Sequence, residues 1–166
     1  VSAVAQVRVY GQLPWTETFE NGRPPFWIGG GGNLRPLNEG GQQLLRKGPS
    51  RTGIHRHALY IGPADMSGYT IQADAIATEK GRRRADLGLI NNGYTLDLQG
   101  NAQRIQIQSW AAELRIDERV PFEWQTNTWY TLKLQVSFNN NKALIKGKIW
   151  KMAENEPTDW TITAED

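Results

Sequence analysis

The sequence predicts an all-β fold in which two antiparallel sheets pack against each other. Apolar and polar residues alternate with a period of two from residue 69 onward, and turn residues separate the alternating runs. No apolar stripe of helical period extends beyond about two turns. Since alternation places apolar side chains on one face of a strand, one face of each strand is expected in a common core.

Four alternating runs predict strands in the second part of the chain. Residues 69–75 and 94–99 alternate without a break, and residues 104–110 place isoleucines on one face and glutamines on the other. The longest run, residues 129–138, places its tyrosine, leucines, valine and phenylalanine on one face. These strands are expected to form the sheets.

Asparagine and glycine occur between the alternating runs. Residues 91–93 (NNG), 100–101 (GN) and 139–141 (NNN) can adopt the positive-φ conformations of tight hairpins. Residues 111–114 are the nearest helical candidate, and they are too few for a stable helix. Because no repeat of propeller-blade length exists, a jelly-roll sandwich of consecutive hairpins is the predicted architecture.

The first 65 residues are richer in glycine and proline and predict fewer strands. Residues 42–47 form one expected strand, and residues 29–32 form a glycine turn. Residues 1–12 suit either an edge strand or the tail of a preceding domain. Since no long polar linker divides the chain, residues 1–166 are predicted to form one β-sandwich domain.

Charge and composition restrict the function. Nineteen lysine and arginine residues against seventeen aspartate and glutamate residues give a net charge of +2, so no nucleic-acid partner is expected. The chain has no cysteine, which excludes thiolate metal sites and a cysteine nucleophile. The absence of an apolar run of about 18 residues predicts no membrane-spanning helix.

Short aromatic and polar segments follow one another in a distinctive order. They are residues 13–15 (LPW), 17–20 (ETFE), 24–27 (PPFW), 69–74 (YTIQAD), 93–96 (GYTL), 104–110 (RIQIQSW), 129–134 (WYTLKL), 147–150 (GKIW) and 160–162 (WTI). In this order they resemble a concanavalin A-like jelly-roll domain. The second half is similar to the domain at the C-terminal end of bacterial PQQ-like β-propeller proteins.

The resemblance implies a concanavalin A-like fold and an extracytoplasmic location, either periplasmic or secreted. It leaves the activity open, because the superfamily includes lectins, carbohydrate-binding modules, hydrolases and adhesion domains. Relatives usually continue past the WTI segment into a last strand ending in Asp-Asn, and here that strand is apparently absent. The resemblance also implies a structural calcium ion with Glu20 among its ligands. Apart from this resemblance, the sequence indicates no metal-binding residues and no cofactor.

Catalysis is not expected from the motifs present. Glucanases of this superfamily carry Glu-x-Asp-x-x-Glu on one strand, and the nearest cluster, residues 113–118, breaks that spacing. An atypical glycoside hydrolase remains an alternative, in which Asp86 or Asp97, with Asp74 nearby, performs acid–base chemistry. Solvated polar positions are the favoured interpretation of these aspartates.

A polar strand face carries the main functional prediction. Trp110 shares an outward face with Gln106 and Gln108, and neighbouring strands are expected to add Asp97 and two further side chains. A flat aromatic ring stacks on the apolar face of a sugar, while amides and carboxylates bond its hydroxyls. The predicted ligand-binding residues are Arg84, which would orient Asp86, together with Asp86, Asp97, Gln106, Gln108 and Trp110.

The sequence therefore predicts a non-catalytic binding module whose partner is a carbohydrate. The alternative is a structural or accessory subunit that docks onto a larger protein assembly through a sheet edge or exposed aromatic side chains. The basic run at residues 80–84 can bind phosphate or an acidic polysaccharide, although such runs are usually solvated.

Overall fold

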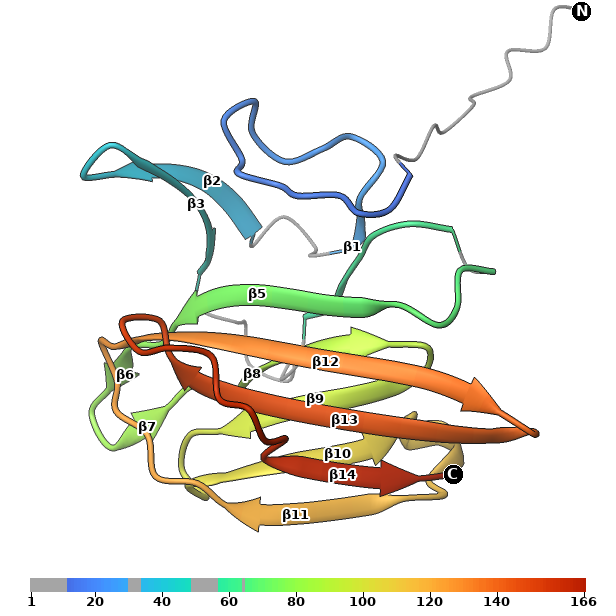
Figure 1. Cartoon of the computed structure of the whole chain (residues 1–166). Helices are drawn as coiled ribbons and strands as arrows, with labels where there is room; N and C mark the ends of the chain where they lie inside the picture. Colours follow the sequence, from blue (N-terminus) through green and yellow to red (C-terminus); the bar gives the residue numbers. More distant parts are fainter. Residues whose placement is uncertain (1–11, 30–33, 49–56, 64) are drawn as a thin grey trace, which may run out of the picture. The chain divides into compact units, whose positions relative to one another are not determined.

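The computed structural model describes residues 12–29, 34–48, 57–63 and 65–166. Its regular elements are strands, apart from one short 3-10 turn, so the predicted all-β class is confirmed (Figure 1). The chain divides into two compact units, residues 1–65 and 66–166, which are described separately below. The organisation as one domain stays a prediction.

The first unit contains two small antiparallel strand pairs. Strand β1 (Ile28–Gly29) pairs with β4 (Leu59–Tyr60), and β2 (Leu34–Glu39) pairs with β3 (Gln42–Lys47), which confirms the strand expected at residues 42–47. Gly40 and Gly41 join β2 to β3 with φ values of 61° and 85°, as a two-residue hairpin turn requires. Residues 1–11 and 30–33, where an edge strand or tail and a glycine turn were predicted, lie outside the described residues.

In the second unit, one sheet is a run of four antiparallel neighbours in the order β11-β10-β9-β8. The strands are β8 (Leu87–Asn91), β9 (Tyr94–Gln99), β10 (Arg104–Ser109) and β11 (Asp117–Pro121). The turn between β8 and β9 has positive φ at Asn92 and Gly93, 48° and 82°, which confirms the hairpin predicted there. Consecutive pairing fixes which side chains share a face of this sheet.

The other sheet has the order β14-β13-β12-β5. Its strands are β5 (Thr70–Ile76), β12 (Trp129–Asn139), β13 (Lys142–Lys151) and β14 (Ile162–Glu165). Asn140 and Asn141 have φ values of 49° and 61° and form the predicted turn between β12 and β13. Along the chain, β5 is the first strand of this sheet. The four strands β8–β11 of the other sheet follow, and the chain then comes back to this sheet as β12, β13 and β14.

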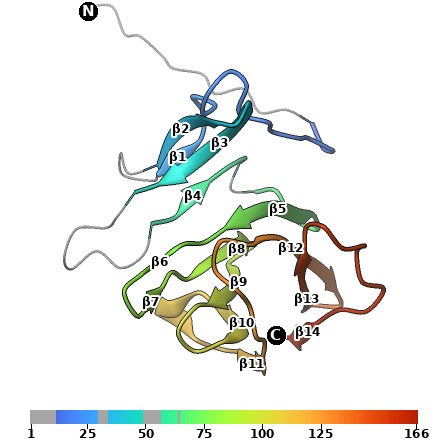
Figure 2. The same cartoon turned by 90° about the vertical axis from the view of Figure 1, so that its left-hand side faces the viewer.

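Figure 2 shows the two four-stranded sheets of this unit facing each other, as in a β-sandwich. Alternate side chains of both sheets point inward and form one buried apolar core. Their burial is the main source of folding free energy for this unit. The fully buried aliphatic side chains are Leu96, Leu98, Ile105, Ile107, Leu132, Leu134, Val136 and Ile145. The finer jelly-roll connectivity stays a prediction.

One polar side chain lies within this core and connects the sheets. Asn91, at the end of β8, is fully buried, and its Nδ2 donates hydrogen bonds to Tyr69 O at 2.8 Å and to Leu134 O at 3.4 Å. Leu134 belongs to β12 of the opposite sheet, so this amide bridges the two layers. These partners satisfy the Nδ2 donor, whereas the buried Oδ1 has no hydrogen-bonding partner within the described residues.

The outer face of the β5–β12–β13–β14 sheet is partly covered by residues 152–161, which we call the covering loop. Lys148 of β13 donates to Pro157 O at 2.7 Å and pairs with Glu156 at 2.7 Å. Its ammonium also lies 4.8 Å from the centroid of the Trp160 ring, within the range of a cation–π contact. The loop leaves Lys148 only 6% exposed.

No part of the chain that the structure describes contains a helix of the length and apolarity needed to cross a bilayer.

Candidate functional site

The outer face of the β8–β11 sheet forms a continuous polar surface in the second unit. The leucines and isoleucines of β9 and β10 point inward, so alternate residues of both strands point away from the core. Strand β11 extends the same face, because Asp117 pairs with Gln108 and Arg119 pairs with Gln106. We call this surface the polar face; it consists of Thr95, Asp97, Gln99, Arg104, Gln106, Gln108, Asp117 and Arg119.

Hydrogen bonds between side chains connect much of the polar face. Arg104 Nε donates to Gln99 Oε1 at 2.6 Å, and Gln99 donates in turn to Gln106. Gln106 then donates through Nε2 to Asp117 Oδ1 at 2.5 Å. As a result Gln106 is only 4% exposed, and the amides are held in fixed orientations.

Asp117 carries the negative charge at one edge of this network. The guanidinium of Arg119 hydrogen-bonds both carboxylate oxygens, and together with the Gln106 amide it lowers the pKa of Asp117. Because hydrogen bonds to the charged form favour that form, Asp117 is ionised at neutral pH. The network therefore ends on a carboxylate whose charge is shared with an arginine.

Two polar side chains on this face make no hydrogen bond within the described residues. Gln108 lies directly across from Thr95 on β9. Within the described residues the amide of Gln108 has no hydrogen-bonding partner, and neither has Thr95 Oγ1, although Thr95 is only 9% exposed. Thr95 Oγ1 has almost no accessible surface, so the half-buried amide of Gln108 is the group that offers donors and an acceptor to a ligand.

Trp110 lies directly beyond Gln108 at the end of β10 and is 48% exposed. Its backbone, with φ −48° and ψ 131°, departs from strand geometry and leads into the short 3-10 turn at Ala111–Glu113. The preceding Ser109 is fully buried, and its Oγ donates to Glu113 O at 3.0 Å and accepts from Arg115 N at 2.7 Å. The hydrogen bonds of Ser109 thus hold the residues before and after Trp110 together.

Asp97 is another predicted site residue that lies on the polar face. It lies opposite Gln106 on β10 and opposite Gly88 on β8, and its side chain is half-buried. A Cβ at Gly88 would lie 2.8 Å from Asp97 Oδ1, so the carboxylate occupies the space that this glycine leaves free. The strand register therefore places Asp97, Gln106 and Gln108 on the polar face, and Trp110 directly follows the end of β10.

Arg84 and Asp86 lie at the end of the sheet, beside the turn from β9 to β10. Arg84 Nε pairs with Glu79 at 3.6 Å, while Asp86 Oδ1 accepts a hydrogen bond from Gly100 N at 2.7 Å. The prediction that Arg84 orients Asp86 is therefore corrected. Arg84 pairs with Glu79 within its own short hairpin, whereas Asp86, two residues later, bonds the β9–β10 turn.

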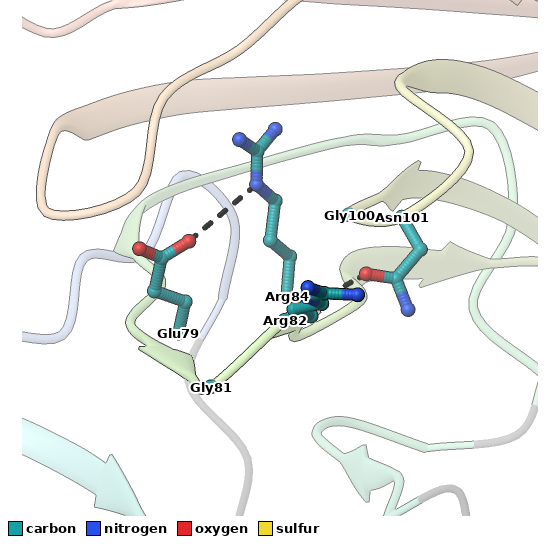
Figure 3. A pocket seen from close by; sticks show the side chains of 6 residues that line it. All are labelled: Glu79, Gly81, Arg82, Arg84, Gly100 and Asn101. Carbon is teal, nitrogen blue, oxygen red and sulfur yellow. Dashed lines mark hydrogen bonds and ion pairs between the residues drawn. The ribbon is translucent and has the colours of Figure 1, made fainter.

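Strands β6 (Glu79–Lys80) and β7 (Arg83–Arg84) form that hairpin and border a hollow of about 380 Å³ (Figure 3). A second hollow of about 350 Å³ adjoins it, since Arg84 lines both. The first is lined by Glu79, Gly81, Arg82, Arg84, Gly100 and Asn101. The second is lined by Arg84, Gln103, Glu123, Trp124, Gln125, Tyr130 and Lys151.

The sequence did not indicate some of the residues that matter at these surfaces. Thr95, Gln99, Arg104 and Asp117 could have been found from hairpin register, because each lies beside a predicted residue once β9, β10 and β11 are paired. Trp124 is 3% exposed and belongs to the core. Its indole donates to Gln99 O at 3.2 Å, a tertiary contact that no local pattern signals.

The aspartates of the hydrolase alternative do not converge. Asp74 is on the outer face of the other sheet, where its Oδ1 accepts a hydrogen bond from Thr131 at 2.6 Å. Asp97 is on the polar face, and Asp86 is bound to the β9–β10 turn. Acid–base hydrolysis of a glycosidic bond needs two carboxyl groups flanking that bond, and this set does not provide them.

The residues that the structure describes contain no group of three or more histidine, aspartate or glutamate side chains suited to holding a metal ion. Glu20 is therefore not joined by further acidic side chains in such a group, whereas calcium takes six to eight oxygen ligands. We assign no residue a role in calcium binding.

The exposed ring of Trp110 thus stands two residues beyond Gln108, whose amide has no hydrogen-bonding partner within the described residues. Comparison of the chain with protein-family models, curated proteins and solved structures gives no match.

Proposed function

We propose that the protein is a non-catalytic binding module whose polar face binds a carbohydrate. Trp110 stacks on the apolar face of a sugar ring, while the amide of Gln108 hydrogen-bonds its hydroxyl groups. The observation that supports this most directly is the 48% exposed indole next to an amide without a hydrogen-bonding partner within the described residues. An aromatic body beside convergent polar groups suits a ligand that is apolar on its faces and polar at its rim.

The amide of Gln108 favours a hydroxylated ligand over an ionic one. An amide offers two donors and a carbonyl acceptor, and a hydroxyl is both a donor and an acceptor. A sugar edge can therefore satisfy both the donors and the carbonyl oxygen of this amide.

The hydrogen-bonded part of the polar face supports binding by being rigid. Arg104, Gln99, Gln106 and Asp117 are already joined to one another, so few side chains lose rotamer freedom when a ligand binds. Ordering a flexible side chain at an interface costs about 0.5–1.5 kcal/mol, and preorganisation avoids that loss. By resemblance to concanavalin A-like domains, the proposal includes an extracytoplasmic location, either periplasmic or secreted.

Glycan binding by two variants tests the proposal. The wild-type chain is screened on a glycan array, and the dissociation constants of the ligands it retains are measured by isothermal titration calorimetry. Trp110→Ala is expected to weaken binding at least about tenfold, because the stacking surface is lost. Leu114→Ala is the matched control, since Leu114 is an exposed apolar residue four positions away. Equal affinities of wild type and Trp110→Ala would contradict the proposal.

A docking function in a larger assembly is the second candidate, because exposed apolar side chains gather at one end of the second unit. Leu114 is 58% and Phe138 52% exposed, and both lie near Asp166, which bonds Arg115 and pairs with Ala143. Purification from the source under mild conditions, followed by mass determination, separates the two functions. A protein that co-purifies in fixed stoichiometry favours docking, whereas a lone chain that binds a glycan favours the carbohydrate proposal.

A further inference from the structure

We propose that the hollow beside the β9–β10 turn binds an acidic group, a carboxylate or a sulfate, of the glycan on the polar face. This inference rests on the proposed carbohydrate function and narrows it to acidic polysaccharides. The hollow is lined by two arginines of the β6–β7 hairpin and by the turn residues Gly100 and Asn101 (Figure 3).

The hairpin is held in a defined position against the turn. Its two-residue loop is Gly81 and Arg82, between the pairs Lys80↔Arg83 and Glu79↔Arg84. The Asn101 side chain accepts a hydrogen bond from Arg84 N at 3.0 Å. The two elements therefore meet through a specific contact, and the arginines keep a fixed relation to the sheet.

The backbone of the β9–β10 turn also packs closely against the end of the hairpin. Gly100 N donates to Asp86 Oδ1 at 2.7 Å, directly after the hairpin. A Cβ on Gly100 would lie 2.6 Å from both Ala85 O and Arg84 Cβ, so the turn approaches β7 as closely as a glycine allows. Such close approach distinguishes this basic segment from a freely solvated run of charges.

The arginines of the hollow retain hydrogen-bonding capacity for an anion. Within the described residues, the Arg82 guanidinium has no partner, and Arg84 has one ion pair, formed through its Nε. Figure 3 shows the Arg84 side chain extending toward Glu79, with its terminal nitrogens beyond the paired Nε. Guanidinium groups match the planar oxygens of carboxylates and sulfates with two parallel hydrogen bonds.

The charge around the two adjoining hollows favours an anion. Arg82, Arg84 and Lys151 contribute three positive charges, and Glu79 and Glu123 contribute two negative ones, which leaves a net charge of +1. The first hollow alone is lined by two arginines and one glutamate, which gives its lining a net charge of +1. The arrangement suits single acidic groups better than the long phosphate backbone of a nucleic acid.

The hollow lies at the opposite end of the polar face from Trp110. Gly100 directly follows Gln99, which pairs with Arg104 at the start of β10, and Trp110 follows the end of that strand. Six residues of a strand span about 20 Å at roughly 3.3 Å per residue. A ligand that reaches both places is therefore a polysaccharide chain rather than a monosaccharide.

A pair of polysaccharides with the same backbone tests this inference. Binding of the full chain to polygalacturonate and to its fully methyl-esterified form, in which the carboxylates are neutral, is compared by calorimetry at low salt. Dextran sulfate and dextran form the second pair and separate sulfate from carboxylate. We expect about tenfold tighter binding to one acidic polymer than to its neutral partner.

Neighbouring arginines provide matched variants. Arg82→Gln is expected to remove the preference for the acidic polymer while leaving binding of the neutral one unchanged. Arg83→Gln removes the same charge one position away, outside the hollow, and is expected to keep the preference. Equal losses in both variants, no preference in the wild type, or equally tight binding of a single-stranded oligonucleotide would overturn the inference.

A small-anion titration distinguishes failure of this site from failure of the proposed function. The side-chain Nε–H signals of Arg82 and Arg84 are followed by NMR during addition of sodium glucuronate and of sodium sulfate. Shifts of these signals with saturation support the hollow even if no polysaccharide is retained, in which case the carbohydrate function fails alone. Binding of neutral polymers without such shifts overturns the acidic site and leaves the proposed function standing.

Discussion

A single glycine determines how the β9–β10 turn meets the β6–β7 hairpin. The sequence predicts that Gly100 and Asn101 supply the positive-φ positions of a tight hairpin, but positive φ occurs instead at Gln103, at 49°. Gly100 is needed for a different reason, which is the close approach of β7. Local turn chemistry could be predicted from the sequence, whereas this contact between segments could not.

Substituting Gly100 is expected to destabilise the second unit. In Gly100→Ala the new methyl group would overlap Ala85 O and Arg84 Cβ, and overpacking of this kind costs about 1–3 kcal/mol. The free energy of unfolding is measured by urea titration with circular dichroism. Gly93→Asn is the control, because Gly93 has positive φ with open space around it and asparagine tolerates that conformation. A loss in the control as large as that in Gly100→Ala would contradict the close-approach argument.

The strands could be predicted more fully than the segments that cover them. Alternation over residues 129–138 indicated β12 almost to its observed ends, because inward apolar residues repeat with the period of the strand. The same alternation places Lys133 on the outer face of the sheet, away from the core. The covering loop changes that environment, since Glu156 hydrogen-bonds the ammonium groups of Lys133 and Lys148. Nothing in the alternation of β12 or β13 signals a loop folded over their outer side.

Acid is expected to weaken the attachment of the covering loop. Hydrogen bonds from Lys133 and Lys148 lower the pKa of Glu156 below its ordinary value of 4.5 in the folded protein. A carboxylate with a lowered folded-state pKa stabilises the fold above its unfolded-state pKa, and this contribution disappears as the pH falls through the folded-state value. The free energy of unfolding should therefore fall between neutral pH and acidic pH below 4.5, partly through this group.

The change Glu156→Gln tests this contribution. The variant is expected to be less stable than wild type at pH 7 and to differ less from it in acid, because the charge is then absent from both. Urea titrations at pH 7 and in acid measure the difference. Glu154→Gln is the matched control, since Glu154 pairs with Lys151 at 3.5 Å between two exposed side chains. A constant difference between Glu156→Gln and wild type at all pH values would refute the linkage.

At the scale of the whole molecule, the buried core found among the described residues lies in residues 66–166. Every residue of the core cluster belongs to this unit, from Ile71 to Ala164. The two sheets and their inward faces could be predicted because alternation persists along each strand. The location of the binding surface could be predicted only in part, because Arg84 and Asp86 are drawn to the β9–β10 turn by contacts between distant segments.

Residues 66–166 are expected to fold without the first unit. A fragment with this range retains both four-stranded sheets and all the buried aliphatic residues, so its unfolding should be cooperative. Far-ultraviolet circular dichroism and urea titration of the fragment are compared with those of the full chain. A broad, non-cooperative transition, or binding of a hydrophobic dye by the fragment, would show that the second unit depends on residues 1–65.

The buried amide of Asn91 bears on how the two sheets are aligned. Apolar contacts attract without direction, so two layers joined only by leucines and isoleucines could slide past each other at little cost. The hydrogen bonds from Asn91 to Tyr69 and Leu134 are directional, and each requires one offset between β8 and the opposite sheet. The side chain of Asn91 thus favours one relative position of the two sheets, because its two hydrogen bonds form only at that position.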